Sequence, residues 1–192
     1  MLILASESQA RLSLLASINI APDQVLPANI DETAFKQELP SDLASRLSLS
    51  KAEKIAPTIV DGIILAADTV SAIGRRVLEK AETDEHVRTY FKLFSGRRHQ
   101  VYSAVCVLKV ENGVVVARRQ KLVKSTLKFK RLEDSEISYY VESQQGIGKS
   151  GGCNIEGLAG AFIIYMQGSA SGVMGLPLYE TCNLLKSVGY NR

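Results

Sequence analysis

Hydrophobic residues in this chain fall alternately into short apolar runs and into helical repeats, and this pattern predicts its elements. Apolar runs and two-residue alternation are typical of strands, whereas recurrence at three and four residues is typical of helices. Strands are predicted at residues 2–5, 63–67, 101–109, 114–118, 122–131 and 161–166. Helices are predicted after the polar segment 6–8, from Ser41 to about Ile55, from Thr83 to just before Gly96, around residues 137–141, and between Pro177 and Gly189.

Strands and helices that alternate from the first residue onward indicate an α/β protein. Asn112 and Gly113 lie between two predicted strands, and this dipeptide is a strong signal for a hairpin turn. The sequence contains neither an internal repeat nor a linker-like segment. We therefore expect one unit over residues 1–192, divided by a cleft into two lobes.

Composition narrows the class of protein. Of the 192 residues, 46% are hydrophobic and 22% are charged, which excludes a disordered or low-complexity chain. The net charge of +3 is too small for a protein that coats nucleic acid, but it suits a pocket that receives an anion. No basic leader precedes the apolar N-terminus, and no apolar run approaches the roughly 20 residues that span a bilayer. We expect a cytoplasmic protein without membrane contact.

The three cysteines point away from disulfides and thiolate metal sites. Cys106, Cys153 and Cys182 are odd in number and widely spaced, and none forms a CxxC pair. This usage favours a reducing compartment. His86 and His99 also lack a second histidine at metal-ligand spacing, so a histidine zinc site is not supported. We expect His86 to be solvated and His99 to make a structural hydrogen bond.

The first candidate site is the segment Ser6 to Arg11, at the start of the first predicted helix. Free backbone N–H groups, two serine hydroxyls and an arginine would meet at this helix start, which is a suitable anion site. The alternative is a plain serine cap with Arg11 on the solvated helix face. The residue pattern alone leaves both interpretations open.

The second candidate is Asp68, followed by Thr69. Because Asp68 directly follows five apolar residues, we expect it at the carboxyl end of a buried strand, where α/β sheets bind ligands. A carboxylate there can hold a divalent metal or accept a proton from water. The alternative is a carboxylate that merely caps a turn.

Two further patterns imitate known sites. Gly148-Lys149-Ser150 is similar to the end of a phosphate-binding P-loop, but Ser143 stands where the first glycine is required. Lys149 remains a candidate phosphate contact. A basic strand contains Lys121, Lys124, Lys128, Lys130 and Arg131. It is more typical of a solvated sheet edge than of a nucleic-acid surface, so no nucleic-acid partner is expected.

Short blocks spread along nearly the whole chain resemble the Maf family of nucleoside triphosphate pyrophosphatases. In chain order they are LILASESQAR (2–11), Asp31-Glu32, Ser50-Lys51-Ala52, ADTV (67–70), LEK (78–80), SGRRHQVY (95–102), KSGGCNIEG (149–157) and GLPL (175–178). A set of blocks in the right order is far more specific than any single block.

The resemblance implies a fold and an activity. The fold is an elongated mixed sheet flanked by helices, with a central cleft between two lobes. The activity is hydrolysis of a nucleoside triphosphate to the monophosphate and pyrophosphate with a divalent metal, Mg²⁺ or Mn²⁺. The family is associated with the removal of non-standard nucleotides and with cell-division arrest, and its members often form homodimers.

The resemblance also assigns roles to residues of this chain. Asp68 is the expected proton acceptor and a metal-orienting carboxylate, with Glu32 as a second acid near the metal. Arg11, Lys51 and Lys80 are expected to offset phosphate charge, and Ser6 and Ser8 to bind phosphate oxygens. The family's positions for selecting the base correspond to Ala10, Thr69 and Glu156.

Departures from the family pattern leave the substrate open. Gln9-Ala10 replaces the family's Pro-Arg, so one expected cation is missing. Thr69 resembles the group that prefers dTTP and UTP, whereas Glu156 resembles the group that prefers 7-methyl-GTP. This mixture favours a general nucleoside triphosphate pyrophosphatase. The missing arginine keeps a second hypothesis open, namely a nucleotide-binding regulator without catalysis.

Overall fold

The computed structural model describes residues 1–191 and contains seven strands. They are β1 (Leu2–Leu4), β2 (Gln24–Val25), β3 (Gly62–Ile73), β4 (Arg76–Leu78), β5 (Arg98–Glu111), β6 (Val114–Phe129) and β7 (Ile163–Gln167). The α-helices are α1 (Gln9–Ser17), α2 (Pro40–Ile55), α3 (Asp84–Phe94), α4 (Asp134–Glu142), α5 (Ala170–Met174) and α6 (Leu178–Ser187). Two 3-10 helices are η1 (Ala56–Thr58) and η2 (Leu158–Phe162).

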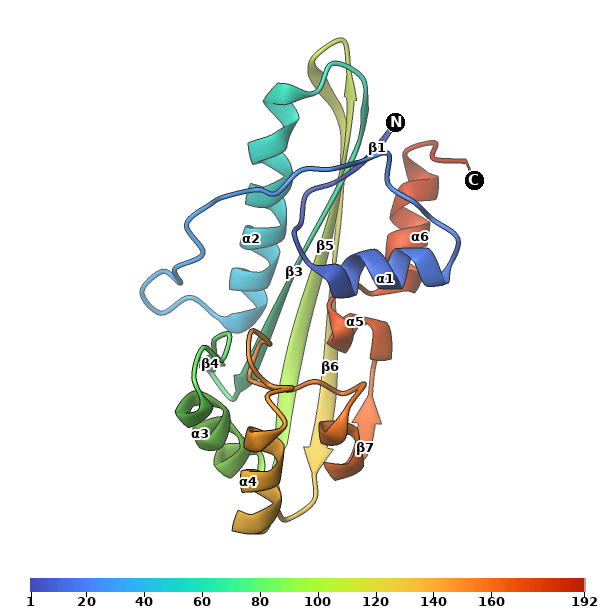
Figure 1. The fold of residues 1–192 in the computed structure, drawn as a ribbon. Coiled ribbons are helices and arrows are strands. Elements are labelled where there is room, and N and C mark those ends of the chain that lie inside the picture. Colours follow the sequence, from blue (N-terminus) through green and yellow to red (C-terminus); the bar gives the residue numbers. More distant parts are fainter. Residues whose placement is uncertain (192) are drawn as a thin grey trace.

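All strands belong to one mixed sheet, which confirms the predicted α/β class. Its order is β2-β1-β3-β5-β6-β7, and β4 pairs with the far end of β3. The strand β1 is parallel to both of its neighbours, and the other pairs are antiparallel. The molecule is elongated, with α2 on one side of the sheet and α1 and α6 on the other at one end (Figure 1).

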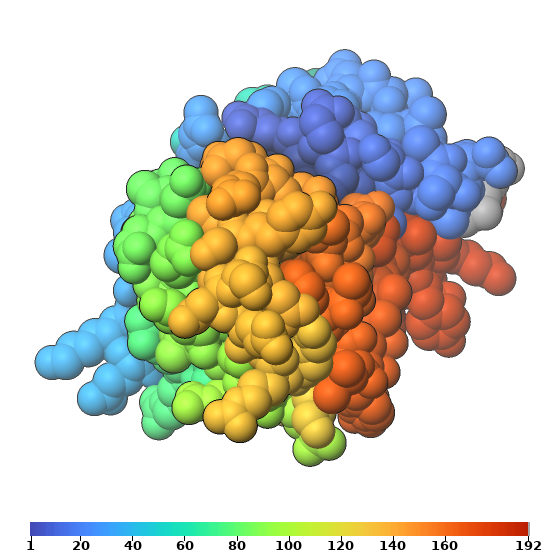
Figure 2. Space-filling view, turned by 60° about the horizontal axis from the view of Figure 1, so that its bottom comes forward, coloured from blue at the N-terminus to red at the C-terminus, as the bar shows by residue number. Residues whose placement is uncertain are grey.

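Different apolar clusters fill the two ends of the sheet. At the end that holds both termini, aliphatic residues of β1, β3 and β5 pack on α1 and α6 on one face and on α2 on the other. At the opposite end the cluster is aromatic, and Phe91 stacks on Tyr140 with ring centroids 4.1 Å apart. Figure 2 shows α3, the segment after α4 and the β7 region gathered at this end. The strands β3, β5 and β6 run through both ends.

The strand that carries Asp68 is longer than predicted. The expectation that it ends at this residue is wrong, because β3 continues to Ile73 and stays paired with β5 as far as Ala72. From Asp68 onward the residues alternate between the two sheet faces, with Val70 and Ala72 buried. Asp68 therefore lies in the middle of a strand and not at its carboxyl end.

The middle of the chain forms one long hairpin. Asn112 and Gly113 have positive φ angles of 51° and 76°, which confirms the predicted turn. The two strands predicted after it are one strand, β6, of 16 residues. The polar residues 119–121, which separate the two predicted strands, lie within the paired strand.

Most helix boundaries agree with the sequence pattern. The helix α3 starts beside Thr83, as expected, and Thr83 caps it by accepting a hydrogen bond from the His86 N–H. The helix α2 begins one residue before Ser41, with Pro40 in its first turn and no side-chain cap. Within residues 1–191, no helix has the length and apolar character needed to cross a membrane.

Candidate active site

The candidate site lies at a gap along the edge of β3. On this side, β1 pairs with residues 63–65 and β4 pairs with residues 71–73, so residues 66–70 have no partner strand there among the described residues. The backbones of Ile63 and Leu65 hydrogen-bond to the β1 segment. Because every second residue of a strand directs its N–H and C=O groups to the same edge, those of Ala67 and Thr69 point into the gap. A cleft of about 820 Å³ opens at this gap, which is within the size range of ligand pockets.

On the α2 side of β3, one lysine binds two carboxylates. Lys51 comes from the buried face of α2, and its Nζ lies 2.5 Å from Asp68 Oδ1 and 2.6 Å from Glu32 Oε1. Asp68 and Lys51 are only 6% and 7% exposed. Burial tends to raise the pKa of Glu32, but hydrogen bonding and the charge of Lys51 outweigh it, so this pKa lies below its ordinary value. Glu32 is therefore ionised at neutral pH.

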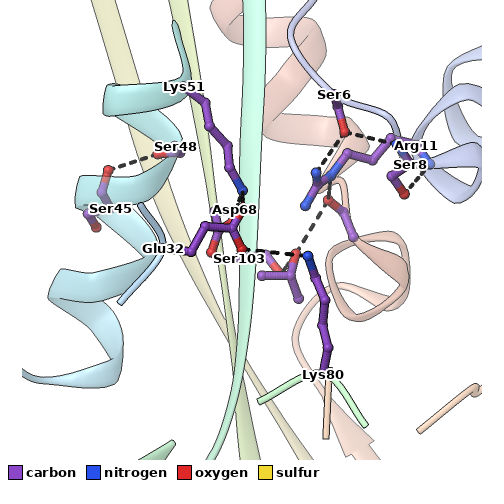
Figure 3. A network of polar contacts seen from close by, with 12 residues as sticks. Ser6, Ser8, Arg11, Glu32, Ser45, Ser48, Lys51, Asp68, Lys80 and Ser103 are labelled. Carbon is purple, nitrogen blue, oxygen red and sulfur yellow. Dashed lines mark hydrogen bonds and ion pairs between the residues drawn. The ribbon is translucent and has the colours of Figure 1, made fainter. Parts of the chain in front are cut away.

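On the other side of β3, an arginine has only neutral oxygen partners. Arg11 donates from Nη1 to Ser6 Oγ at 2.8 Å and from Nε to the Gly175 carbonyl at 2.9 Å. Burial lowers its pKa, while the charges of Asp68 and Glu32 oppose that shift. No ion pair with a carboxylate is present for Arg11 within residues 1–191. Figure 3 shows Arg11 and Ser6 across the strand from Lys51 and Glu32.

The start of α1 has the serine cap expected from the sequence, and its use as an anion site stays a prediction. Ser8 caps the helix by accepting from the Arg11 N–H, and its own N–H donates to Ser6 Oγ. The predicted serine cap and the predicted cleft position are therefore both present. Because Arg11 bonds to Ser6 and Gly175, the interpretation that places it on the solvated helix face is wrong.

Thr69 and Ser103 connect this side of the cleft to the C-terminal segment. Their hydroxyl oxygens lie 3.2 Å apart across β3 and β5, and Ser103 Oγ donates to the Gly172 carbonyl at 2.6 Å. Thr69 and Arg11 both donate to the Gly175 carbonyl. Sequence reasoning did not single out Ser103, although its place in a predicted strand was visible in the pattern.

A glycine-rich loop positions Lys80. The residues around Lys80 pair with the segment at Ser150, and Gly151 donates its N–H to the carbonyls of residues 78 and 79. Gly151 has a φ of +63°, and a Cβ there would lie 2.9 Å from the Ser71 Cβ, so a side chain would not fit. The residues Gly148-Lys149-Ser150 thus pair with the Lys80 segment of the same chain and form no P-loop. Lys80 is largely exposed, and its Nζ lies 3.5 Å from Glu32 Oε2.

All the predicted site residues lie around this single cleft. They are Ser6, Ser8, Arg11, Glu32, Lys51, Asp68, Thr69, Lys80 and Glu156. Glu156 is exposed at the aromatic end of the molecule, and Lys149 also lines the cleft. Their shared location is a finding of the structure, whereas their individual roles stay predictions.

His99 differs from expectation and also lines the cleft. It is buried at 1% exposure, and neither ring nitrogen has a hydrogen-bond partner within residues 1–191, so the predicted structural hydrogen bond is wrong. Its ring stacks on Phe94 with centroids 4.1 Å apart. Burial lowers the pKa of His99 to about 4, so the imidazole is neutral at pH 7. Burial likewise raises the pKa of Cys153, another residue of the cleft, to about 12, which disfavours its thiolate form.

The carboxylates present fit a divalent cation only in part. The oxygens of Glu32 and Asp68 converge on one cation, the Lys51 ammonium, and carboxylate oxygens are the ligands that Mg²⁺ and Mn²⁺ prefer. No group of three or more metal-binding His, Cys, Asp or Glu side chains exists in the described chain. Magnesium is commonly held by one or two carboxylates together with substrate phosphates. The donor set therefore fits a metal that phosphate oxygens also bind.

The fold and this cleft define a mixed α/β protein with a pocket at a sheet edge that is lined by both cations and carboxylates. The sequence profile of the family described as Maf-like protein matches residues 1–188. A protein of Rickettsia rickettsii (strain Sheila Smith) named nucleoside triphosphate pyrophosphatase is 53% identical over 190 residues, covering 98% of this chain and 88% of its own. One of the same name from Orientia tsutsugamushi is 50% identical, covering 99% and 93%. This chain belongs to the Maf-like family.

Solved structures show more distant likeness. A HAM1 protein from Coxiella burnetii has a TM-score of 0.45 and 16% identity, covering 68% of this chain and 73% of its own. A nucleoside-triphosphatase described as a dITP/XTP pyrophosphatase from Mycobacterium abscessus has a TM-score of 0.46 and 12% identity, covering 97% and 93%.

Proposed function

We propose that this protein is a nucleoside triphosphate pyrophosphatase, which hydrolyses a nucleoside triphosphate to the monophosphate and pyrophosphate. The observation that carries the proposal is the juxtaposition of Asp68 and Lys51 with Arg11 across one strand edge. An enzyme of this class must hold a polyanion and activate water at the same place. Relatives that share half of its residues bear the corresponding name.

Binding of the triphosphate is assigned to the cations and to the start of α1. Arg11, Lys51 and Lys80 offset the phosphate charge, while Ser6 and Ser8 donate to phosphate oxygens together with free N–H groups of the helix. Arg11 suits this role because its present partners are neutral oxygens and leave its charge uncompensated. The unpaired backbone edge at Thr69 offers a further donor to an anionic oxygen.

Asp68 is proposed to accept the proton of the water that attacks the α-phosphorus. Its ordered place in β3 fixes the carboxylate relative to the bound phosphates, which favours in-line attack. The pyrophosphate then leaves as the new P–O bond forms. A divalent metal, Mg²⁺ or Mn²⁺, would be held by Glu32 and Asp68 and would supply charge neutralisation at the phosphates.

The nucleobase is assigned to the part of the cleft that Thr69 and Glu156 line. These two residues resemble different specificity groups of the family, so a broad substrate range is proposed. Removal of non-standard nucleotides, a link to cell-division arrest, a cytoplasmic location, a homodimer and the absence of a nucleic-acid partner are the wider expectations. They stay predictions.

One observation supports a second candidate, a nucleotide-binding regulator without catalysis. Ala10 lines the cleft where the family pattern has an arginine, so one cation is missing beside the proposed phosphate site. Such a protein would bind nucleotides tightly and form no product.

A nucleotide panel tests both candidates. The full chain is incubated with Mg²⁺ or Mn²⁺ and each canonical, deoxy and modified triphosphate, and pyrophosphate, orthophosphate and monophosphate are quantified separately. Equal amounts of pyrophosphate and monophosphate are expected. Orthophosphate with diphosphate would contradict the proposal, and tight binding without product would favour the regulator.

A further inference from the structure

The charges on the α2 side of β3 already balance in the protein alone. The carboxylates of Glu32 and Asp68 face the ammonium groups of Lys51 and Lys80, two negative charges against two positive ones. Arg11 adds a further positive charge on the other side of the strand. A divalent cation entering alone would give these five groups together a net charge of +3, whereas one entering with a triphosphate would not.

The lysine occupies the point at which the two carboxylates converge. Lys51 Nζ is bonded at 2.5 Å to Asp68 and at 2.6 Å to Glu32, and the ion pair with Asp68 is almost completely buried. A cation that bridges the same two carboxylates must displace this ammonium. Because an unpaired buried ammonium is costly, the displacement requires a new anionic partner for Lys51.

We propose that Lys51 acts as a stand-in for the divalent metal in the free protein, and that the metal enters only together with the polyphosphate. This inference rests on the proposed function. The polyphosphate supplies the new partner for Lys51, and the carboxylates released from it become available to the metal. The elements suit this exchange, since Asp68 is fixed in β3 while Lys51 has a long flexible stem and Glu32 lies outside regular structure.

Metal binding to the full chain provides the main test, with Mn²⁺ followed by electron paramagnetic resonance. The wild type is expected to bind Mn²⁺ only weakly in the absence of an anion. The variant Lys51→Met retains the stem and removes the charge, so its Mn²⁺ affinity should rise at least tenfold. Lys54→Met, at an exposed position of the same helix, is the matched control and should behave as the wild type. Wild-type affinity equal to that of Lys51→Met would overturn the inference.

A second measurement needs only the wild type and therefore does not depend on the folding of the variant. Inorganic tripolyphosphate, which lacks a base, is titrated by calorimetry with and without Mn²⁺, and binding of the metal to the free anion is subtracted. Because coupling between two ligands is reciprocal, Mn²⁺ should tighten tripolyphosphate binding at least tenfold. An unchanged affinity would contradict coupled entry.

These outcomes are separable from the fate of the proposed function. A protein that releases pyrophosphate but binds Mn²⁺ tightly by itself refutes the stand-in role alone. A protein that shows the coupling but forms no product refutes the catalytic proposal alone and leaves the exchange at Lys51 supported.

Discussion

The two faces of β3 differ in how they hold charge, although the residues involved are neighbours in sequence. On the face of Asp68, two carboxylates are paired with the Lys51 ammonium at distances of 2.5 and 2.6 Å, and Lys80 balances the remaining charge at 3.5 Å from Glu32. On the face of Thr69, Arg11 is held by a hydroxyl and a backbone carbonyl, which orient its guanidinium without neutralising it. The arrangement on the Asp68 face suits the proposed replacement of the Lys51 ammonium by a divalent metal. The arrangement on the Thr69 face suits binding of an anion by Arg11.

The largest effect is expected at the carboxylate of the first face. Asp68→Asn keeps the shape of the side chain but removes its capacity to accept a proton, so turnover should fall about 1,000-fold. Pyrophosphate release at saturating nucleotide measures this loss, and circular dichroism verifies the fold. Asp42→Asn, at an exposed position of α2, serves as the control. Turnover within tenfold of the wild type would remove Asp68 from the chemistry.

A second prediction concerns the neutral histidine near the Thr69 face. Because burial lowers the pKa of His99 to about 4, the unfolded chain binds its proton more readily below about pH 6.5. Stability should therefore be fully present above pH 6.5 and decline as the pH falls toward 4, by about 3 kcal/mol in total. Urea unfolding at several pH values measures this.

The matched variants for that prediction are His99→Phe and His86→Gln. The first should flatten the decline between pH 6.5 and 4, because it removes the titrating group from the aromatic cluster. The second changes an exposed histidine and should leave the decline in place. Equal pH dependence in the wild type and in His99→Phe would show that another group is responsible.

The arginine of the second face provides a third prediction. Arg11→Lys keeps the charge but loses the planar guanidinium, which donates hydrogen bonds to Ser6 and to the Gly175 carbonyl at the same time. We expect kcat/KM to fall about 100-fold, as for the loss of one oriented donor to a phosphate oxygen. Steady-state kinetics measure this, with Arg88→Lys on α3 as the control. A change below threefold would mean that the orientation of Arg11 contributes little.

The smallest effect on activity is expected for Ser103, which supports the Thr69 face through its hydrogen bonds. Ser103→Ala removes the hydrogen bond to the Gly172 carbonyl and the contact with Thr69, so the Gly175 carbonyl that orients Arg11 loses support. We expect kcat/KM to fall about tenfold, consistent with one or two lost hydrogen bonds. Restoration of activity in Ser103→Thr would distinguish the lost hydroxyl from a packing defect.

Local patterns predicted most elements and the two candidate segments, Ser6 to Arg11 and Asp68-Thr69. The resemblance to the Maf family added Glu32, Lys51, Lys80 and Glu156, and contacts between distant segments stayed hidden. The strand pattern identified Asp68, but we ended the strand there because a charge rarely lies inside one. The charge is tolerated because β1 has already ended at this level and Lys51 of α2 neutralises it. Neither cause is visible within the local sequence.

The orientation of Arg11 illustrates the same limit. Its partner, the Gly175 carbonyl, lies 164 residues away in sequence and has no side chain to mark it. The likeness of Gly148-Lys149-Ser150 to a P-loop was correctly rejected from the missing first glycine. Its actual use, pairing with the Lys80 segment, depends on tertiary structure that no spacing rule describes.

Three uninterrupted strands, β3, β5 and β6, extend through both ends of the molecule. These paired strands make the sheet beneath the cleft rigid. A hinge rotation of one end of the molecule against the other would therefore require breaking hydrogen bonds between all three strands. Adaptation to different ligands is therefore expected to come from the irregular segments that line the cleft, the one that carries Glu32 and the glycine-rich one around residues 148–156.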